Sequence, residues 1–269
     1  MLTAVLLVLQ AEAQREKWEA MMAQARSYTE QKEYDKAIQC NEELIAELKA
    51  HGGAGLAETI RDNNAIIYMY KAVPLLKEKK YAEAKVFFDK AVENAKPDGK
   101  TYYMAQSYLG QWYSLQSQDF RINQGSLEEA IVLSENAERH FNMANAPEKR
   151  LKEQVTRAGM LADLSRTTEA ISLYNSVMEE CNGNPGRDLI RAKALSNLGN
   201  VEQKLEDYQS AIAHLEEAYP LCMKDKDKTY ALITALRLYN LYTYNIPDAE
   251  KAQLWGQRKE ELEVITGRK

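Results

Sequence analysis

Three histidines are the first candidates for chemistry, because imidazole serves both as a general base and as a metal ligand. His51, His140 and His214 lie far apart in the chain. None belongs to a His-x-x-x-His pair or a His-Glu-x-x-His motif, the spacings that bring two imidazoles to one side of a helix for zinc. We therefore predict no metal site and no catalytic histidine.

The cysteines and glycines also lack catalytic spacing. Cys40, Cys181 and Cys222 are odd in number and widely separated, so they form neither a disulfide framework nor a zinc motif, and we expect small buried side chains. The sequence has no G-x-S-x-G motif. Gly52 and Gly53 precede a predicted helix without the lysine and strand of a phosphate-binding loop. We predict a non-enzymatic protein without cofactors.

Composition favours an all-α fold. The 269 residues are 45% hydrophobic and 28% charged, with only 12 glycines and 6 prolines interrupting long runs of helix-forming residues. A chain of this length can bury a sizeable core. The net charge of -5 is small and the charges are interleaved, so a nucleic-acid partner is not expected.

The N-terminus resembles a secretory signal. Residues 2–9 are an almost unbroken apolar run, and Ala11 and Ala13 form an A-x-A cleavage site. The run is too short to cross a bilayer, which requires about 20 apolar residues. No lysine or arginine precedes it, which leaves a leader that packs on the first repeat as the alternative. We predict a signal peptide over residues 1–13 and a mature chain without a membrane span. The protein is then exported to the periplasm or the medium; without cleavage it is cytoplasmic.

Residues 81–94 show how the rest of the chain is built. Ala84, Phe88 and Ala91 are spaced four and three residues apart, so they share one side of a helix. Two helices approach to about 8 to 10 Å only where side chains are small, and an aromatic ring fills the space beside them. We interpret this stripe as a joint between helices.

Similar stripes recur along the chain. The equivalent small residues are Ala37, Ala84, Ala130, Ala170, Ala211 and Ala249, with Ala252 as the alternative to the last, which gives intervals of 47, 46, 40, 41 and 38 residues. We predict helices over residues 15–31, 34–50, 56–79, 81–94, 147–164, 168–181 and 248–265. Residues 116–126 are predicted to form a loop that ends in a capping box of Ser126 and Glu129.

These helix pairs resemble the tetratricopeptide repeat, which places Leu-Gly and Tyr in its first helix and Ala, an aromatic and Ala in its second. The matching residues are Leu109-Gly110-Tyr113, Ala84-Phe88-Ala91, and Leu198-Gly199 with Tyr208-Ala211-Leu215-Ala218. Every interval exceeds the usual period of about 34 residues, as in long bacterial repeats of this family. The resemblance implies a right-handed α-solenoid of stacked antiparallel helix pairs. One domain of five to six pairs would occupy residues 14–269.

The resemblance also implies a function. In such arrays the first helix of each pair lines a concave face that holds peptides. The residues predicted to line it are Met22, Arg26, Met69, Tyr70, Val73, Met104, Tyr108, Gln111, Lys193, Asn197 and Asn200. We therefore predict a non-catalytic scaffold or adaptor that binds a protein or peptide. The alternative is a sensory or regulatory module whose output domain is on another chain or missing. The sequence predicts no oligomeric state.

Three of these residues allow a sharper comparison. Lys193, Asn197 and Asn200 resemble the lysine and asparagine positions of the carboxylate clamp found in some tetratricopeptide domains. The preceding first helix offers Lys152, Thr156 and Gly159 instead, which do not match. One matching repeat is not a clamp, so we do not predict one.

Overall fold

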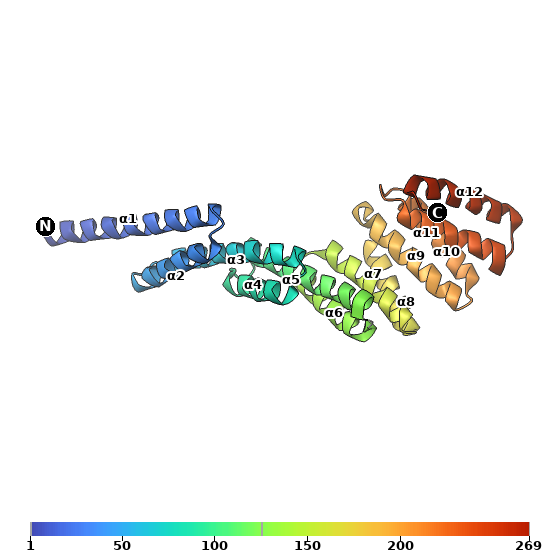
Figure 1. The fold of residues 1–269 in the computed structure, drawn as a ribbon, viewed down its shortest axis with the longest axis horizontal. Helices are drawn as coiled ribbons and strands as arrows, with labels where there is room; N and C mark the ends of the chain where they lie inside the picture. The colour runs from blue at the N-terminus through green and yellow to red at the C-terminus, as the bar shows by residue number, and fades with distance from the viewer. Residues whose placement is uncertain (1, 125, 269) are drawn as a thin grey trace. The chain divides into compact units, whose positions relative to one another are not determined.

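The computed structural model describes residues 2–124 and 126–268, and the side chains from residue 9 onward except that of residue 124. Within these residues it contains twelve α-helices and no strand (Figure 1), which confirms the predicted all-α fold. The helices divide into two compact units. The first unit is Met1–Gln116 with Arg139–Ala146, and the second unit is Ser117–Glu138 with Pro147–Lys269.

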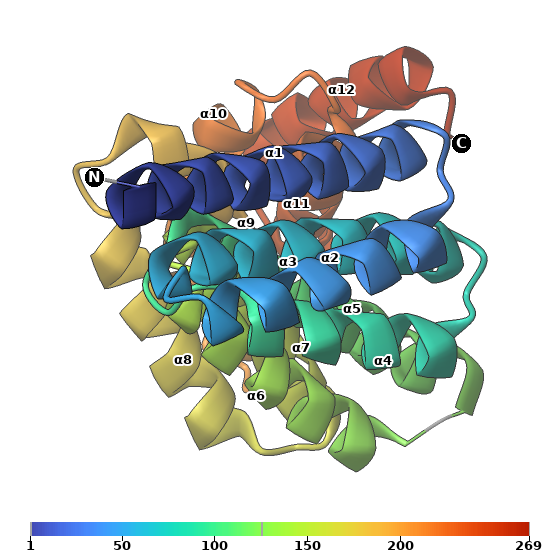
Figure 2. The ribbon, with the colours of Figure 1, turned by 90° about the vertical axis from the view of Figure 1, so that its left-hand side faces the viewer.

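The first unit is built from consecutive helices that pack on one another. Its helices are α1 (Leu2–Glu30), α2 (Tyr34–Ala50), α3 (Ala54–Lys77), α4 (Tyr81–Asn94) and most of α5 (Lys100–Asp119). Helix α2 packs on both α1 and α3, and Figure 2 shows these three side by side. Ala84, Phe88 and Ala91 of α4 are all fully buried, so the predicted joint between helices is confirmed.

The second unit continues the same pattern. Helix α6 (Leu127–Met143), whose last turn belongs to the first unit, is followed by α7 (Pro147–Asp163), α8 (Thr167–Cys181), α9 (Asp188–Lys204), α10 (Tyr208–Cys222), α11 (Thr229–Asn240) and α12 (Ala249–Thr266). A short 3-10 turn, Pro185–Arg187, precedes α9, and a π-helical turn, Leu241–Asn245, follows α11. The buried stripe of α8 consists of the predicted small residue Ala170 together with Tyr174 and Val177.

Four turns inside helix pairs share one backbone conformation, which their residue types do not predict. Lys32, Lys79, Ser165 and Glu206 have φ values of 61°, 59°, 60° and 62°, in the left-handed region that favours glycine. In each turn the next residue donates its backbone N–H to a carbonyl five residues earlier, as Lys80 does to Leu75 at 2.9 Å. This bond pattern ends a helix and reverses the chain. The repeat is therefore visible in the turns as well as in the packed stripes.

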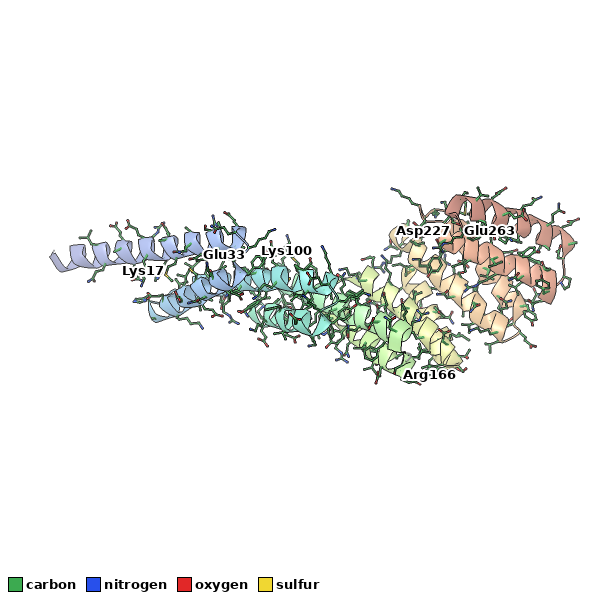
Figure 3. The ribbon with its side chains drawn as sticks, in the orientation of Figure 1. Lys17, Glu33, Lys100, Arg166, Asp227 and Glu263 are labelled. Atoms are coloured by element: carbon green, nitrogen blue, oxygen red, sulfur yellow. The ribbon has the colours of Figure 1, made fainter. Side chains whose placement is uncertain are left out.

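Most charged side chains lie on the outer surfaces, where many of them pair across neighbouring turns or helices. Lys17 of α1 contacts Glu47 of α2 at 2.8 Å, and Arg166 contacts Glu169 within the second unit at 2.7 Å; Figure 3 labels both basic residues. Exposed pairs of this kind contribute little to stability. The packed stripes therefore account for most of it. Among the described residues, no helix combines the length and the apolar character needed to cross a membrane.

The predicted loop over residues 116–126 is wrong for most of its length. Helix α5 continues to Asp119, and Phe120–Gln124 form a π-helical turn. The buried Ser117 hydroxyl donates to the Ala130 carbonyl at 2.7 Å, which ties this segment to α6. The polar residues of this segment predicted a loop, because a bond such as that of Ser117 to another helix cannot be inferred from local sequence. Of the predicted capping box, the Glu129 N–H lies 3.4 Å from the Ser126 hydroxyl.

Spacing alone does not show which apolar residues of the last pairs are buried. Leu205 and Leu236 are 53% and 42% exposed, whereas Leu238 is buried. Ala252 packs against the core, whereas Ala249 is exposed, so Ala252 is the equivalent of Ala211. The apolar residues of α11 are too dense for spacing alone to select a side.

Gly199 allows the packing of the second unit to be tested. A methyl group at this position of α9 would lie 2.8 Å from Leu215 Cγ and 3.1 Å from the Ala211 carbonyl oxygen. Overpacking of this kind costs about 1 to 3 kcal/mol, against about 1 kcal/mol of gained helix propensity. We expect Gly199→Ala to destabilise the second unit, as measured by amide hydrogen exchange in α9 and α10.

Gly159 of α7 is the matched control. A methyl group there would lie 3.5 Å from the Tyr174 hydroxyl, an ordinary contact. Gly159→Ala is therefore expected to stabilise α7 by about 1 kcal/mol. Slower exchange in both variants would contradict the close approach of α9 and α10.

Candidate functional site

A pocket in the second unit gathers polar side chains from three successive first helices. Its volume is about 260 Å³, and its lining comes from α7, α9 and α11, with one residue of α8 and one of the π-helical turn Phe120–Gln124. The lining residues are Arg121, Val155, Thr156, Gly159, Ala162, Asp163, Tyr174, Asn197, Asn200, Val201, Lys204, Tyr230 and Arg237. We call this hollow the second-unit pocket.

Tyr174 forms the floor of the pocket. Its side chain is 1% exposed, and burial raises the pKa of its hydroxyl well above the ordinary value, while the nearby Arg237 charge and a hydrogen bond with Asn197 oppose the shift. The hydroxyl therefore stays protonated at neutral pH.

Arg237 enters the pocket from α11. Its Nη1 donates to the Ser196 carbonyl and, at 3.0 Å, to the Ser196 hydroxyl. The Ser196 hydroxyl also lies 2.9 Å from the Thr234 hydroxyl, which donates to the Tyr230 carbonyl at 2.7 Å. Burial lowers the pKa of Arg237, but a guanidinium remains protonated in proteins. The pocket therefore contains a permanent positive charge.

The charges that line the second-unit pocket do not balance. Arg121, Lys204 and Arg237 are cations and Asp163 is the one carboxylate, which gives a net charge of +2 in a chain whose net charge is -5. Arg121 and Asp163 lie 3.9 Å apart and largely compensate each other. Lys204 is exposed and has no ion pair within the described part of the chain. The uncompensated charge thus rests with Lys204 and Arg237.

The first unit has a more apolar hollow between α1, α2 and α3. Its volume is about 340 Å³, and its lining residues are Met22, Ala25, Arg26, Thr29, Asn41, Ile60, Asn63, Ile66, Ile67 and Tyr70. The side chain of Asn41 is held by a buried hydrogen bond from its Nδ2 to Asn64 Oδ1 at 2.8 Å. Tyr70 is 51% exposed at the rim. This hollow suits an apolar anchor.

Comparison with known proteins agrees with this architecture. Residues 154–224, which run from within α7 to just beyond α10, match the family model of the tetratricopeptide repeat. Residues 154–224 therefore carry tetratricopeptide repeats. No curated protein matches the chain.

Solved structures match the chain in fold. BtubC (BKLC) from P. vanneervenii matches with a TM-score of 0.54 at 16% identity, over 93% of this chain and 92% of that one. The apo form of RapI has a TM-score of 0.54 at 13% identity, over 92% and 76%. A Rap protein complexed with competence and sporulation factor has a TM-score of 0.50 at 14% identity, over 93% and 77%. At these identities the similarity is one of fold.

The predicted binding residues lie in several different environments. Met22, Arg26 and Tyr70 line the first-unit hollow, and Asn197 and Asn200 line the second-unit pocket. Met104 and Gln111 are exposed on α5 and line neither. Lys193 lies 4.4 Å from the centre of the Tyr230 ring instead of entering the pocket.

Three predicted contacts belong wholly or partly to the core of the first unit. Met69 is 2% exposed, so its prediction as a binding residue is wrong: its neighbour Tyr70 takes the surface position, and successive helical side chains point in different directions. Tyr108 is half-buried and stacks on Phe88 with ring centres 5.8 Å apart. Val73 is half-buried against the same cluster.

Sequence reasoning missed the main charged groups of the second-unit pocket. Arg237, Lys204, Asp163 and Tyr174 were not predicted as site residues. A signal for Arg237 was present, because it is the only charged residue in α11, a helix otherwise rich in apolar residues. A single arginine in such a helix indicates either an internal partner or a ligand.

The histidines have structural partners in separate elements. Nδ1 of His140 lies 2.7 Å from Gln106 Oε1, and Nδ1 of His214 lies 2.7 Å from Glu202 Oε2. Nδ1 of His51 lies 2.8 Å from a carbonyl of its own helix. Within the described parts of the chain, no three His, Cys, Asp or Glu residues are grouped as metal ligands. Cys181 and Cys222 are buried, as predicted, and Cys40 is half-buried.

Proposed function

We propose that the chain is a non-catalytic scaffold that binds a protein or peptide partner against the first helices of its repeats. The second-unit pocket carries this proposal, because α7, α9 and α11 each contribute side chains to one hollow. Side-chain amides such as that of Asn200 both donate and accept hydrogen bonds, as a peptide backbone does. A Rap protein of similar fold has been solved with competence and sporulation factor, so this type of fold can hold a partner.

The first-unit hollow supports the same function with different chemistry. Met22, Ile66 and Tyr70 provide a flexible and aromatic lining, while Arg26 and Asn63 provide polar groups at its edge. Apolar anchors in such hollows contribute much of the affinity for a partner. The proposed partner therefore supplies both polar and apolar side chains.

The proposal predicts that filling the second-unit pocket weakens binding. Peptides selected from a degenerate library by the full chain would be measured by fluorescence anisotropy. Asn200→Tyr is expected to reduce their affinity about tenfold or more, because a ring would occupy the space of the bound segment. Gln209→Tyr, the same type of change at an exposed position of α10, is the control and should bind as the wild type does. Selection of no peptide, or equal binding by both variants, would contradict the proposal.

Regulation is the second candidate function. Two of the three structures named above are Rap proteins, although similarity at 13% and 14% identity concerns the fold alone. We propose, as the alternative, a sensory or regulatory module whose output domain lies elsewhere. Export of the protein also stays a proposal, since the side chains of the apolar run up to residue 8 lie outside the described residues.

A further inference from the structure

Arg237 differs from the other partly buried arginines of the second unit. Arg150, Arg157, Arg187 and Arg191 each contact at least one carboxylate, and Arg258 lies over the Trp255 ring at 4.4 Å. Arg237 contacts the Ser196 carbonyl and hydroxyl through Nη1. Among the described residues, no carboxylate forms an ion pair with it. The ionisable groups that affect it most are the hydroxyls of Tyr174 and Tyr230.

This arrangement is unfavourable unless another group completes it. A buried guanidinium loses hydration, and a neutral carbonyl compensates that loss less well than an anion does. An arginine cannot escape the cost by losing its proton. Its five N–H donors match a carboxylate in a planar, two-bond geometry, and Nη1 alone bonds to Ser196. The remaining donors are those of Nε and Nη2, beside the second-unit pocket that Arg237 lines.

The surroundings of Arg237 favour an anion. Lys204 adds a second uncompensated charge to the pocket, and Asp163 already contacts Arg121. Tyr174 and Tyr230, both in the lining, supply hydroxyl groups that donate hydrogen bonds to anions. The pocket is therefore complementary to one negatively charged group.

We propose that Arg237 binds a carboxylate of the partner, so that the second-unit pocket selects an acidic peptide. Arg237 provides the directional contact, and Lys204 at the exposed edge attracts the anion at longer range. This proposal rests on the proposed function and specifies its partner. It differs from the clamp considered above, because Lys193 does not line the pocket.

Small probes test the carboxylate site independently of any peptide. The full chain would be titrated with N-acetylglutamate N-methylamide, followed by NMR of the amides of α9 and α11 at constant ionic strength. We expect saturable shifts in these helices and none with the uncharged glutamine analogue. N-acetylglycine carries only a C-terminal carboxylate. Comparing its shifts with those of the glutamate probe shows whether the pocket prefers a side-chain or a C-terminal carboxylate. Absence of shifts with both carboxylates would overturn the proposal.

Two variants assign the site to residues. Arg237→Gln is expected to weaken binding of the glutamate probe about tenfold or more, and to melt at the same temperature as the wild type or higher, because an uncompensated buried charge is removed. A purely structural arginine would lower the melting temperature and leave probe binding unchanged, which would overturn the proposal. Lys204→Gln, at an exposed position, should weaken binding less and reduce its dependence on salt.

The peptide library separates this proposal from the proposed function. We expect Asp and Glu to be enriched among peptides selected by the wild type and not among those selected by Arg237→Gln. Selected peptides without acidic enrichment would overturn the carboxylate site and leave the scaffold function standing. Binding of the glutamate probe by a chain that selects no peptide would support the carboxylate site and contradict the scaffold function.

Discussion

Phe88→Ala is expected to lower the stability of the first unit by about 3 to 5 kcal/mol. Phe88 is fully buried in α4, where it packs among Ala72, Leu76 and Leu109 and stacks on Tyr108. Its removal leaves a cavity that these neighbours, which belong to α3 and α5, cannot fill without separating from one another. The measurement is amide hydrogen exchange in α3, α4 and α5, which reports the first unit by itself.

Val86→Ala is the control for this effect. Val86 lies on the same helix but is 52% exposed, so its truncation creates no cavity, and we expect a change of about 0.5 kcal/mol or less. Equal protection from exchange in Phe88→Ala and the wild type would contradict the role of the stripe as a joint. The second unit should exchange normally in both variants.

Arg157→Met is expected to destabilise the second unit by about 3 to 5 kcal/mol. Arg157 of α7 contacts Glu138 of α6 at 2.6 Å, and their side chains are 19% and 12% exposed. Burial raises the pKa of Glu138, and the charge of Arg157 opposes this shift. Without Arg157, the carboxylate is left buried beside Glu153, a second acidic group. The measurement is hydrogen exchange in α6 and α7.

The pH dependence of Arg157→Met follows from the same carboxylate. A glutamate whose pKa is raised on folding binds more protons in the folded state, so stability falls as the pH rises through the raised pKa. Removal of Arg157 raises the pKa of Glu138 further. The loss of stability is therefore expected to be smaller at about pH 5 than at about pH 7.

Two further variants define the contribution of the ion pair. Arg157→Met combined with Glu138→Leu removes both charges and should recover most of the lost stability. Arg166→Met breaks an exposed pair with Glu169, whose side chains are 45% and 57% exposed, and should cost about 1 kcal/mol or less. Similar losses in Arg157→Met and Arg166→Met would show that burial does not govern the effect.

The sequence predicted the packed elements well because their signal is local. The bounds of α2 and α4 agree with the predicted ranges, and the small residues Ala37, Ala84, Ala130, Ala170 and Ala211 are all fully buried. Spacing of four and three residues reports a helix side wherever apolar residues are sparse. In α11, where apolar residues are dense, spacing does not tell the exposed Leu236 from the buried Leu238.

Backbone conformation and polar partners were much harder to predict. Lys32, Lys79, Ser165 and Glu206 adopt the left-handed conformation without glycine, because the packed helices on both sides impose the reversal. Likewise, Ser117 bonds to the Ala130 carbonyl of another helix, a contact that no local pattern contains. Such choices depend on residues that meet only after the helices pack.

The three histidines that first suggested chemistry have partners within the fold, while the candidate site consists of residues with weaker local signals. The sequence by itself determined the helices, their pairing and the repeat, because periodic burial is encoded in neighbouring residues. Only the tertiary structure decided that Arg237 of α11 shares a pocket with Asn197 of α9 and Tyr174 of α8. Whether a charge is compensated depends on groups distant in the chain, so the uncompensated Arg237 became visible only once the helices were placed together.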